Sequence, residues 1–292
     1  MSTTDTAARD TRGEGTSSRP SGPRSPLRAA VQFAGRHVVV VAAVGSLTYL
    51  LLPIAVVILQ SFNKPAGRYN TSFNEFTLSN WTNMCAAGGM CDSVVLSLQI
   101  AVLATIGATV LGSAIAFALV RHRFRGRSSI NMLIFLPMAT PEVVMGSSLL
   151  TLFVSMQMRL GFWTLLIAHI MFTLSFVVVT VKARLSGLDP NLEEAARDLY
   201  ANAWSTFWRV TFPLALPGIM AAAMLAFALS FDDFIVSNFN AGNEVNFPMF
   251  VWGASRRGVP PQVNVIGTLM FVVALLAVVG GQWAAAQRHR SR

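Results

Sequence analysis

The feature that most constrains this chain is a series of long apolar runs separated by short polar connections. Each run has at least 18 residues, and about 20 helical residues cross the hydrocarbon core of a bilayer. Only 12% of the 292 residues are charged, where a soluble protein carries about 25%. Most of the chain must therefore meet lipid or other buried helices. The sequence predicts an all-α, polytopic membrane protein with six transmembrane helices, at about 38–61, 94–120, 130–154, 162–181, 212–236 and 263–283.

The first 36 residues differ in composition from the rest of the chain. They are rich in Ser, Thr, Arg, Pro and Gly and nearly devoid of large apolar side chains. Such a segment cannot bury enough surface to offset its ordering entropy. We expect residues 1–36 to form a disordered cytoplasmic tail and residues 37–292 to form the membrane domain. The run at 38–61 is too long for a signal-peptide core, so we expect it to remain as an anchor.

The distribution of Lys and Arg predicts the orientation. Seventeen of the 22 lie in the N-terminal tail, the second-to-third and fourth-to-fifth connections and the C-terminal tail, and five lie in the alternate connections. Cytoplasmic connections carry the excess of Lys and Arg, so both termini are predicted to be cytoplasmic. The formal net charge of +9 does not indicate a nucleic-acid partner, because the basic residues sit at the ends of apolar runs and not on one face.

Two cysteines, Cys85 and Cys91, lie in the first predicted external loop. A disulfide that closes this small loop is possible in an oxidising compartment. Two unpaired thiols are the open alternative. Neither their spacing nor any other pattern in the chain indicates a metal site, and we expect no cofactor.

The connection between the fourth and fifth spans contains two predicted short helices, at about 189–210. Asp189 followed by Pro190 is typical of a helix start. Apolar residues then recur on one face of the first helix, at Leu192, Ala195, Ala196 and Leu199. The second helix is predicted to start at Asn202, to carry Trp204, Phe207 and Trp208, and to end at Pro213. These helices form either a docking site for a soluble partner or a loop that lies on the membrane surface.

The segment Glu194-Ala195-Ala196-Arg197-Asp198-Leu199, together with Val210 to Ile219, resembles the EAA signature of ABC importer permeases. The resemblance implies a type I importer fold and coupling helices that sit in a cleft of an ATP-binding subunit. The coupling residues that it implies here are Glu194, Ala195, Ala196, Asp198, Tyr200 and Phe207. Tyr200 stands where the family usually has Gly. Because Tyr accepts a positive φ poorly, we expect this turn to close differently from the family turn.

Within that family, three segments resemble spermidine/putrescine permeases: Pro137 to Gly146, Leu229 to Val236 and Arg256 to Asn264. The resemblance implies a polyamine importer whose partners are two ATP-binding ABC subunits, a second related permease and an extracytoplasmic polyamine-binding protein. The chain has no Walker A sequence, so we do not expect it to hydrolyse ATP. No HExxH motif and no Ser/His/Asp arrangement indicates a membrane enzyme.

The predicted spans contain the acids Glu142, Asp232 and Asp233 and the single histidine His169, and no Lys or Arg. Acids inside a membrane normally face a protein interior or an aqueous path. At 1.5 Å per residue, Glu142 and Asp232 lie ~18 Å and ~20 Å from the inner ends of their spans. All three acids can therefore lie at one depth, where they suit a cationic substrate. His169 is more typical of a packed, hydrogen-bonded histidine than of a transport residue.

The two aspartates are ~100° apart around a continuous helix, so only one can face the path fully. Polar residues form a stripe with Asp233, namely Ser230, Ser237 and Asn240, whereas the neighbours of Asp232 are apolar. We therefore expect Asp233, Ser230 and Ser237 to line the path with Glu142, and Asp232 to bond between helices. The alternative is that both aspartates are purely structural.

Other functions compete with this interpretation. A secondary transporter or channel would work alone, whereas an ABC permease needs its ATPase. Within the ABC importers, the absence of basic residues from the spans disfavours anions. Iron remains an alternative substrate, because carboxylates also suit hard metal cations.

Overall fold

The structure is a computed structural model that describes residues 26–67, 72–122, 124–189 and 191–290. The chain divides into two units, residues 1–55 and residues 56–292. The first unit contributes most of α1 (Pro26–Ser61), which includes the predicted first span. The predicted disordered tail, residues 1–36, overlaps this helix over residues 26–36, and residues 1–25 lie outside the described residues.

After the end of α1 at Ser61, the second unit continues with a short loop. Strands β1 (Asn63–Lys64) and β2 (Glu75–Phe76) pair antiparallel, and the short helix α2 (Ser79–Thr82) follows. A disulfide joins Cys85 to Cys91, whose Cα atoms are 5.4 Å apart, which settles the alternative left open by the sequence. Cys91 is the second residue of α3 (Met90–Arg121), so the loop is covalently closed onto the start of that helix.

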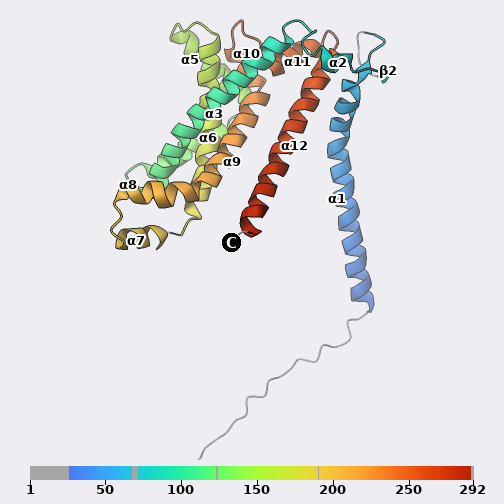
Figure 1. Ribbon diagram of the computed structural model, residues 1–292. Coiled ribbons are helices and arrows are strands. Elements are labelled where there is room, and N and C mark those ends of the chain that lie inside the picture. Colours follow the sequence, from blue (N-terminus) through green and yellow to red (C-terminus); the bar gives the residue numbers. More distant parts are fainter. Residues whose placement is uncertain (1–25, 68–71, 123, 190, 291–292) are drawn as a thin grey trace, which may run out of the picture. The chain divides into compact units, whose positions relative to one another are not determined.

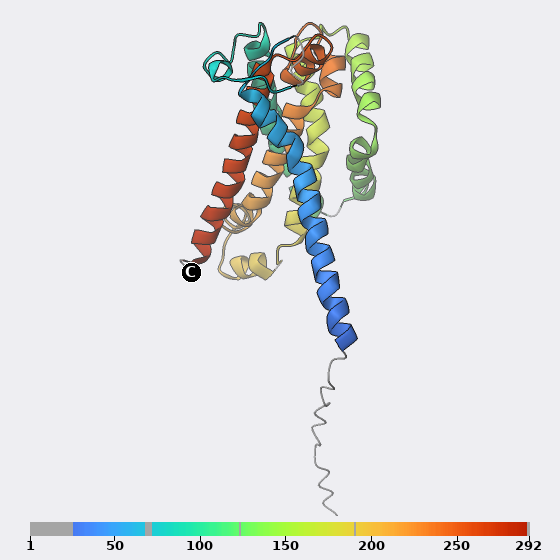
Figure 2. The same cartoon turned by 90° about the vertical axis from the view of Figure 1, so that its right-hand side faces the viewer.

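Three helices form the centre of this unit: α3, α6 (Phe162–Ser186) and α9 (Phe212–Asp232) (Figures 1 and 2). They share one apolar core in which small residues alternate with branched ones, such as Ala108, Ala116, Val177, Val181 and Ala222. Small side chains allow transmembrane helices to approach closely. The helices are apolar on all sides, as expected where the outer faces meet lipid.

The predicted third span is wrong as a continuous helix. It consists of α4 (Arg127–Ala139) and α5 (Glu142–Ser155), which are bent by 107° at Thr140 and Pro141. Pro141 lacks an amide proton and disfavours the helical conformation for the residue before it, and Thr140 is accordingly extended, with ψ 134°. Hydropathy detects an apolar run but not a change of backbone direction within it.

Beyond α6 the chain forms α7 (Asn191–Asp198), α8 (Ala203–Thr206) and the π-helical turn η1 (Phe207–Thr211), which leads into α9 without a break. Asn202 caps α8, as predicted, by accepting a hydrogen bond from the Ser205 amide. Pro213 does not end the second helix. It is the second residue of α9, which continues the helix from η1.

The predicted fifth span is also interrupted. α9 ends at Asp232, and the separate helix α10 (Ile235–Asn240) follows after two residues. Two further helices complete the chain, α11 (Phe247–Ser255) and α12 (Pro261–Arg290). Over the described residues, five helices are long and apolar enough to cross a membrane, or six if the bent α4–α5 pair is counted as one span.

Candidate translocation and coupling sites

The two aspartates lie at the break between α9 and α10. Asp233 is extended (φ −70°, ψ 121°), and its carboxylate accepts hydrogen bonds from the backbone amides of Val236 at 3.2 Å and Ser237 at 2.8 Å. The carboxylate therefore satisfies amides at the start of α10 that have no partner within the helix. This local arrangement explains why the helix stops here: Asp233 starts a new helix instead of continuing the old one.

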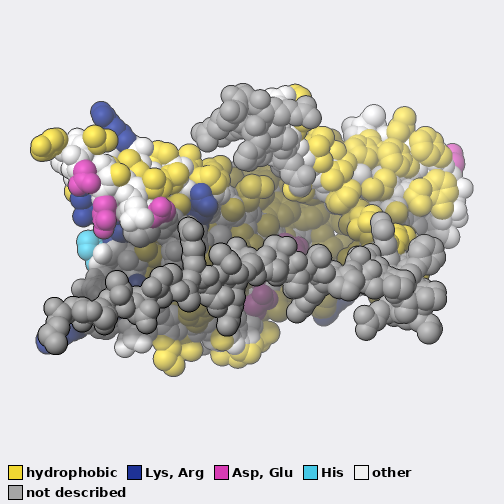
Figure 3. All heavy atoms as spheres, turned by 90° about the horizontal axis from the view of Figure 1, so that it is seen from below, with side chains coloured by type: hydrophobic (Ala, Val, Ile, Leu, Met, Phe, Trp, Pro, Cys, Tyr) yellow, Lys and Arg dark blue, Asp and Glu magenta, His cyan; other side chains and the backbone are white. Residues whose placement is uncertain are grey.

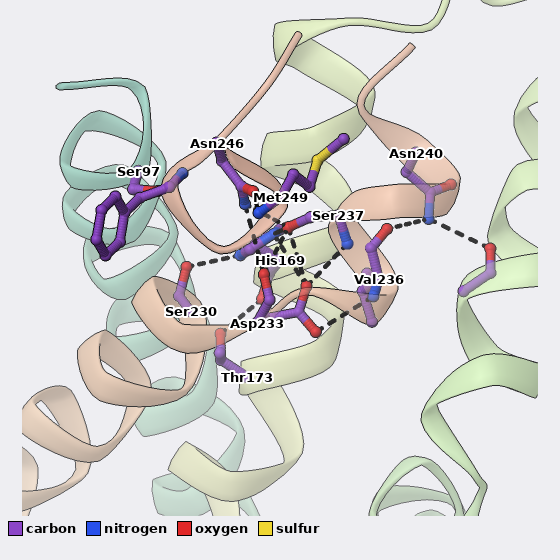
Figure 4. Close-up of polar contacts among 12 residues, drawn as sticks. Ser97, His169, Thr173, Ser230, Asp233, Val236, Ser237, Asn240, Asn246 and Met249 are labelled. Carbon is purple, nitrogen blue, oxygen red and sulfur yellow. Dashed lines mark hydrogen bonds and ion pairs between the residues drawn. The ribbon is translucent and has the colours of Figure 1, made fainter. Parts of the chain in front are cut away.

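His169 of α6 lies beside this break and is fully buried (Figure 4). Its Nδ1 atom is 2.7 Å from the Ser230 hydroxyl and its Nε2 atom is 2.9 Å from the Ser237 hydroxyl. The Ser237 hydroxyl donates its one proton to Asp233 and accepts a hydrogen bond from the side-chain amide of Asn246. We therefore assign the proton of His169 to Nε2, which leaves Nδ1 to accept from Ser230. His169 is thus a packed, hydrogen-bonded histidine.

The structure reverses the predicted orientation of the aspartates. Asp233 is only 7% exposed, and the stripe that it forms with Ser230 and Ser237 points into the subunit, toward His169. Asp232 is exposed. The predicted stripe is present, since Ser230, Asp233 and Ser237 are all buried, but helical spacing alone does not tell whether a polar stripe faces a path or the interior of the subunit.

Glu142 is exposed and lies in the first turn of α5, directly after the bend. The predicted depth of Glu142 assumed an unbroken helix and does not apply. α5 packs against α10, where the Asn240 side chain donates to the Gly146 carbonyl at 3.2 Å. Gly146 allows this approach, because a Cβ atom there would lie 2.9 Å from the ring of Phe239. The helices that begin at the two breaks are therefore neighbours.

The predicted coupling residues lie on and after α7, a helix that buries none of its side chains within the subunit. Glu194, Ala195 and Asp198 are exposed, and Ala196 is half-buried. The view of this end of the molecule in Figure 3 shows acidic and basic side chains gathered on the side where α7 and α8 lie in Figure 1. An amphipathic helix with an uncovered apolar face is typical of a docking surface.

The prediction that the turn at Tyr200 differs from a Gly-containing turn is wrong. Tyr200 adopts φ +61°, the left-handed conformation that Gly would adopt. Its amide donates to the Arg197 carbonyl at 2.9 Å, and the Ala201 amide donates to the Ala196 carbonyl at 3.0 Å. This pair of bonds is a Schellman motif, which satisfies the last carbonyls of α7. The motif imposes the backbone angle although a tyrosine occupies the position.

The aromatic residues of the second coupling helix divide into two groups. Phe207 packs edge-on against Phe117 of α3, with ring centroids 5.2 Å apart, so it fixes the helix to the bundle. Trp204 is 72% exposed and stacks edge-on with the exposed Trp208 at 5.6 Å. Of the predicted aromatic contacts to a partner, the two tryptophans are therefore available and Phe207 is largely occupied inside the subunit.

Several polar residues that build these sites were not singled out in the sequence. Asn246 caps α11 and donates to Ser237, and Ser97 of α3 accepts from the Phe247 amide. An Asn followed by Phe-Pro is a recognisable helix start, but its second bond depends on the fold. Glu193 of α7 pairs with Arg121 of α3, a contact between segments 72 positions apart. Within the described ranges, no three His, Cys, Asp or Glu residues are grouped to hold a metal ion.

Comparisons with known proteins agree with this architecture. Residues 108–288 match the family described as "Binding-protein-dependent transport system inner membrane component". The chain is 37% identical over 243 residues to the spermidine/putrescine transport system permease protein PotC of Escherichia coli (strain K12), covering 83% of this chain and 91% of that protein. It is 33% identical to the putrescine transport system permease protein PotI of the same organism, covering 88% and 89%.

The fold is also that of solved importers. One chain of a bacterial ABC transporter involved in the import of the acidic polysaccharide alginate superposes with a TM-score of 0.59 at 18% identity, covering 89% of this chain and 97% of that chain. At this identity the match concerns the fold alone. The family match covers more than half of the chain and the relatives align over most of their length, so this multi-pass membrane protein belongs to the family of binding-protein-dependent transport system inner membrane components.

Proposed function

We propose that this chain is the permease subunit of an ATP-driven importer that moves spermidine or putrescine into the cytoplasm. The observation that carries the proposal is the pair of interrupted helices, which leave the acids Glu142 and Asp232 exposed at neighbouring breaks. Interrupted transmembrane helices form substrate sites in other transporters. The names of the relatives PotC and PotI support polyamines as the substrate class.

The proposed assembly contains two ATP-binding subunits, a second related permease and an external polyamine-binding protein. Both termini and α7 face the cytoplasm, and the disulfide-closed loop faces outward. The Lys and Arg distribution supports this orientation. The ATPase docks on the uncovered face of α7 through Glu194, Ala195 and Asp198, and on Tyr200 and Trp204 beyond it. The exposure of these side chains supports their role as contacts.

The proposed path differs from the one that the sequence alone suggested. Glu142 and Asp232 face the path and receive the ammonium groups in turn. Asp233, Ser230 and Ser237 lie beneath Asp232 and hold the break in shape through His169. A path must release what it accepts, and exposed acids bind a cation less tightly than buried ones do.

Uptake of radiolabelled spermidine and putrescine by the complete complex in proteoliposomes tests this function. We expect Asp232→Asn and Glu142→Gln to slow uptake about tenfold, which corresponds to about 1.4 kcal/mol, while the variants keep the wild-type melting temperature. Asp233→Asn should instead lower the melting temperature, because it removes a charged acceptor from a buried network. Glu244→Gln is the matched control, since Glu244 is an exposed acid in the turn after α10.

Unchanged uptake in both Asp232→Asn and Glu142→Gln would contradict the acidic path. ATP-dependent uptake of iron but not of polyamines would favour a different solute for the same importer. Uptake by the chain alone, without the ATP-binding subunits, would indicate a secondary transporter or channel instead.

A further inference from the structure

The coupling helix α7 is attached to the rest of the subunit in an unusual way. It has eight residues, none of them buried, so apolar packing does not fix its position. Of the α7 side chains in the described structure, only Glu193 makes a hydrogen bond or ion pair with another element. A short helix without apolar packing is free to tilt unless polar contacts hold it. Glu193 is therefore the side chain through which polar contacts hold α7 against the bundle.

Glu193 belongs to a closed network of three side chains from three elements. Its carboxylate forms an ion pair with the guanidinium group of Arg121, the last residue of α3. It also accepts a hydrogen bond from the Thr211 hydroxyl of η1 at 2.8 Å. Arg121 Nη2 in turn donates to the same hydroxyl at 3.0 Å. We call Arg121, Glu193 and Thr211 the α7 anchor.

The α7 anchor is shielded from water more than a surface ion pair. The Glu193 side chain is 17% exposed and the Arg121 side chain 31% exposed, whereas the pair Lys64–Glu75 is about two-thirds exposed on both sides. Thr211 is buried. A shielded charge pair with a third hydrogen-bonding partner is stronger and better oriented than an exposed pair. The anchor can therefore transmit a displacement of α7 without first coming apart.

Arg121 connects the anchor to α3, the longest of the three central helices. α3 has 32 residues and spans ~48 Å at 1.5 Å per residue. It packs along both α6 and α9. At its other end, α3 carries the disulfide-bonded Cys91, and its Ser97 hydroxyl accepts a hydrogen bond from the Phe247 amide at the start of α11. A movement of its last turn therefore reaches the part of the subunit that contains the interrupted helices.

We propose that Arg121, Glu193 and Thr211 transmit movements of the ATPase-bound α7 to α3, so that the anchor links ATP hydrolysis to opening of the path. The three side chains are positioning residues that touch neither ATP nor solute. This role rests on the proposed function, because it requires an ATPase docked on α7. The chain itself joins α7 to α6 and α8, and the anchor gives α7 a second connection, to α3.

The test uses the complete complex in proteoliposomes and measures spermidine uptake per ATP hydrolysed. We expect Glu193→Gln and Arg121→Gln each to lower this ratio about tenfold, within the usual range of coupling between two sites. Both variants should retain the ATPase subunits at wild-type stoichiometry, because the exposed face of α7 is unchanged. Combining both substitutions should lower the ratio no further than either alone, since they break one interaction. The exchange Arg121→Glu with Glu193→Arg should restore part of the coupling.

Two controls separate the possible outcomes. Glu75→Gln breaks the exposed pair with Lys64 by the same chemical change and should leave the ratio unchanged. Ala195→Trp blocks the docking face and should abolish ATPase association. If Ala195→Trp leaves association and uptake normal, the proposed docking on α7 is wrong. If Ala195→Trp behaves as expected but Glu193→Gln and Arg121→Gln keep the wild-type ratio, or lose the ATPase subunits altogether, the transmission role is overturned and docking on α7 stands.

Discussion

At the scale of single residues, Tyr200 combines an unfavourable backbone conformation with a side chain that has no contact to compensate for it. Its φ is +61° and its side chain is 99% exposed. The left-handed conformation costs an L-residue other than Gly roughly 1–2 kcal/mol. The Schellman bonds of Tyr200 and Ala201 keep the turn in place despite this cost. Backbone strain of this kind clusters at functional sites, which supports the proposed contact of Tyr200 with a partner.

Tyr200→Gly should therefore stabilise the isolated subunit. Gly adopts positive φ freely, so we expect the free energy of unfolding to rise by about 1 kcal/mol, seen as a higher melting temperature in detergent. Tyr200→Ala removes the ring but retains the Cβ atom, and should give no such increase. Equal stabilisation by Gly and Ala would show that the ring, and not the backbone, is responsible.

At the scale of helices, the sequence located the apolar segments well but revealed neither the 107° bend between α4 and α5 nor the break at Asp233. α3 and α6 contain the predicted spans 94–120 and 162–181. The bends at Pro141 and Asp233 depend on how single residues bond to the backbone, which a count of apolar residues does not measure. Pro141 is visible as a possible interruption in the sequence. Asp233 is not, because its capping role depends on whether the next helix starts there.

The same limit applied to the candidate site. The structure brings Asp232, Asp233, Ser230, Ser237 and His169 together at one break, and their role in transport stays a prediction. Helical spacing placed Ser230, Asp233 and Ser237 on one face, but it does not tell which face of the helix points into the subunit. The α7 anchor could not be predicted from the sequence, for a different reason. Arg121 and Glu193 belong to separate connections, and only the packing of α3 against η1 and α9 brings them together.

The packing of α3 against α6 makes a prediction about Gly112. A Cβ atom at this position would lie 2.7 Å from Cγ1 of the buried Val177. We expect Gly112→Ala to force the two helices apart and to lower the free energy of unfolding by about 1–3 kcal/mol, the usual cost of overpacking. The measurement is the melting temperature of the purified subunit.

Two further variants make this test specific. Gly280 of α12 has open space around it, so Gly280→Ala should be neutral or slightly stabilising, as expected from helix propensity. Val177→Ala creates room on the opposing helix, so the double variant Gly112→Ala with Val177→Ala should be less destabilised than the two single effects added together. Additive effects would show that the two positions do not contact each other.

At the scale of the whole molecule, the second unit has two chemically different ends joined by α3. One end carries the disulfide and the short strands, and the other carries α7 and the Tyr200 turn (Figure 1). A membrane importer needs this asymmetry, because solute arrives on one side and ATP is hydrolysed on the other. The disulfide is consistent with an oxidising compartment at the first end. The uncovered apolar face of α7 supports the proposed docking of a protein partner at the second end.

The orientation can be measured with single cysteines in a chain whose native pair is replaced by Cys85→Ala and Cys91→Ala. Phe76→Cys places a thiol at an exposed position on β2, and Tyr200→Cys places one at the exposed turn after α7. With the ATP-binding subunits absent, a membrane-impermeant maleimide should label Phe76→Cys in intact cells. It should label Tyr200→Cys only after the membrane is permeabilised, because the connections richer in Lys and Arg stay inside. Labelling of Tyr200→Cys in intact cells would reverse the orientation, and labelling of both sites there would contradict a membrane-spanning α3.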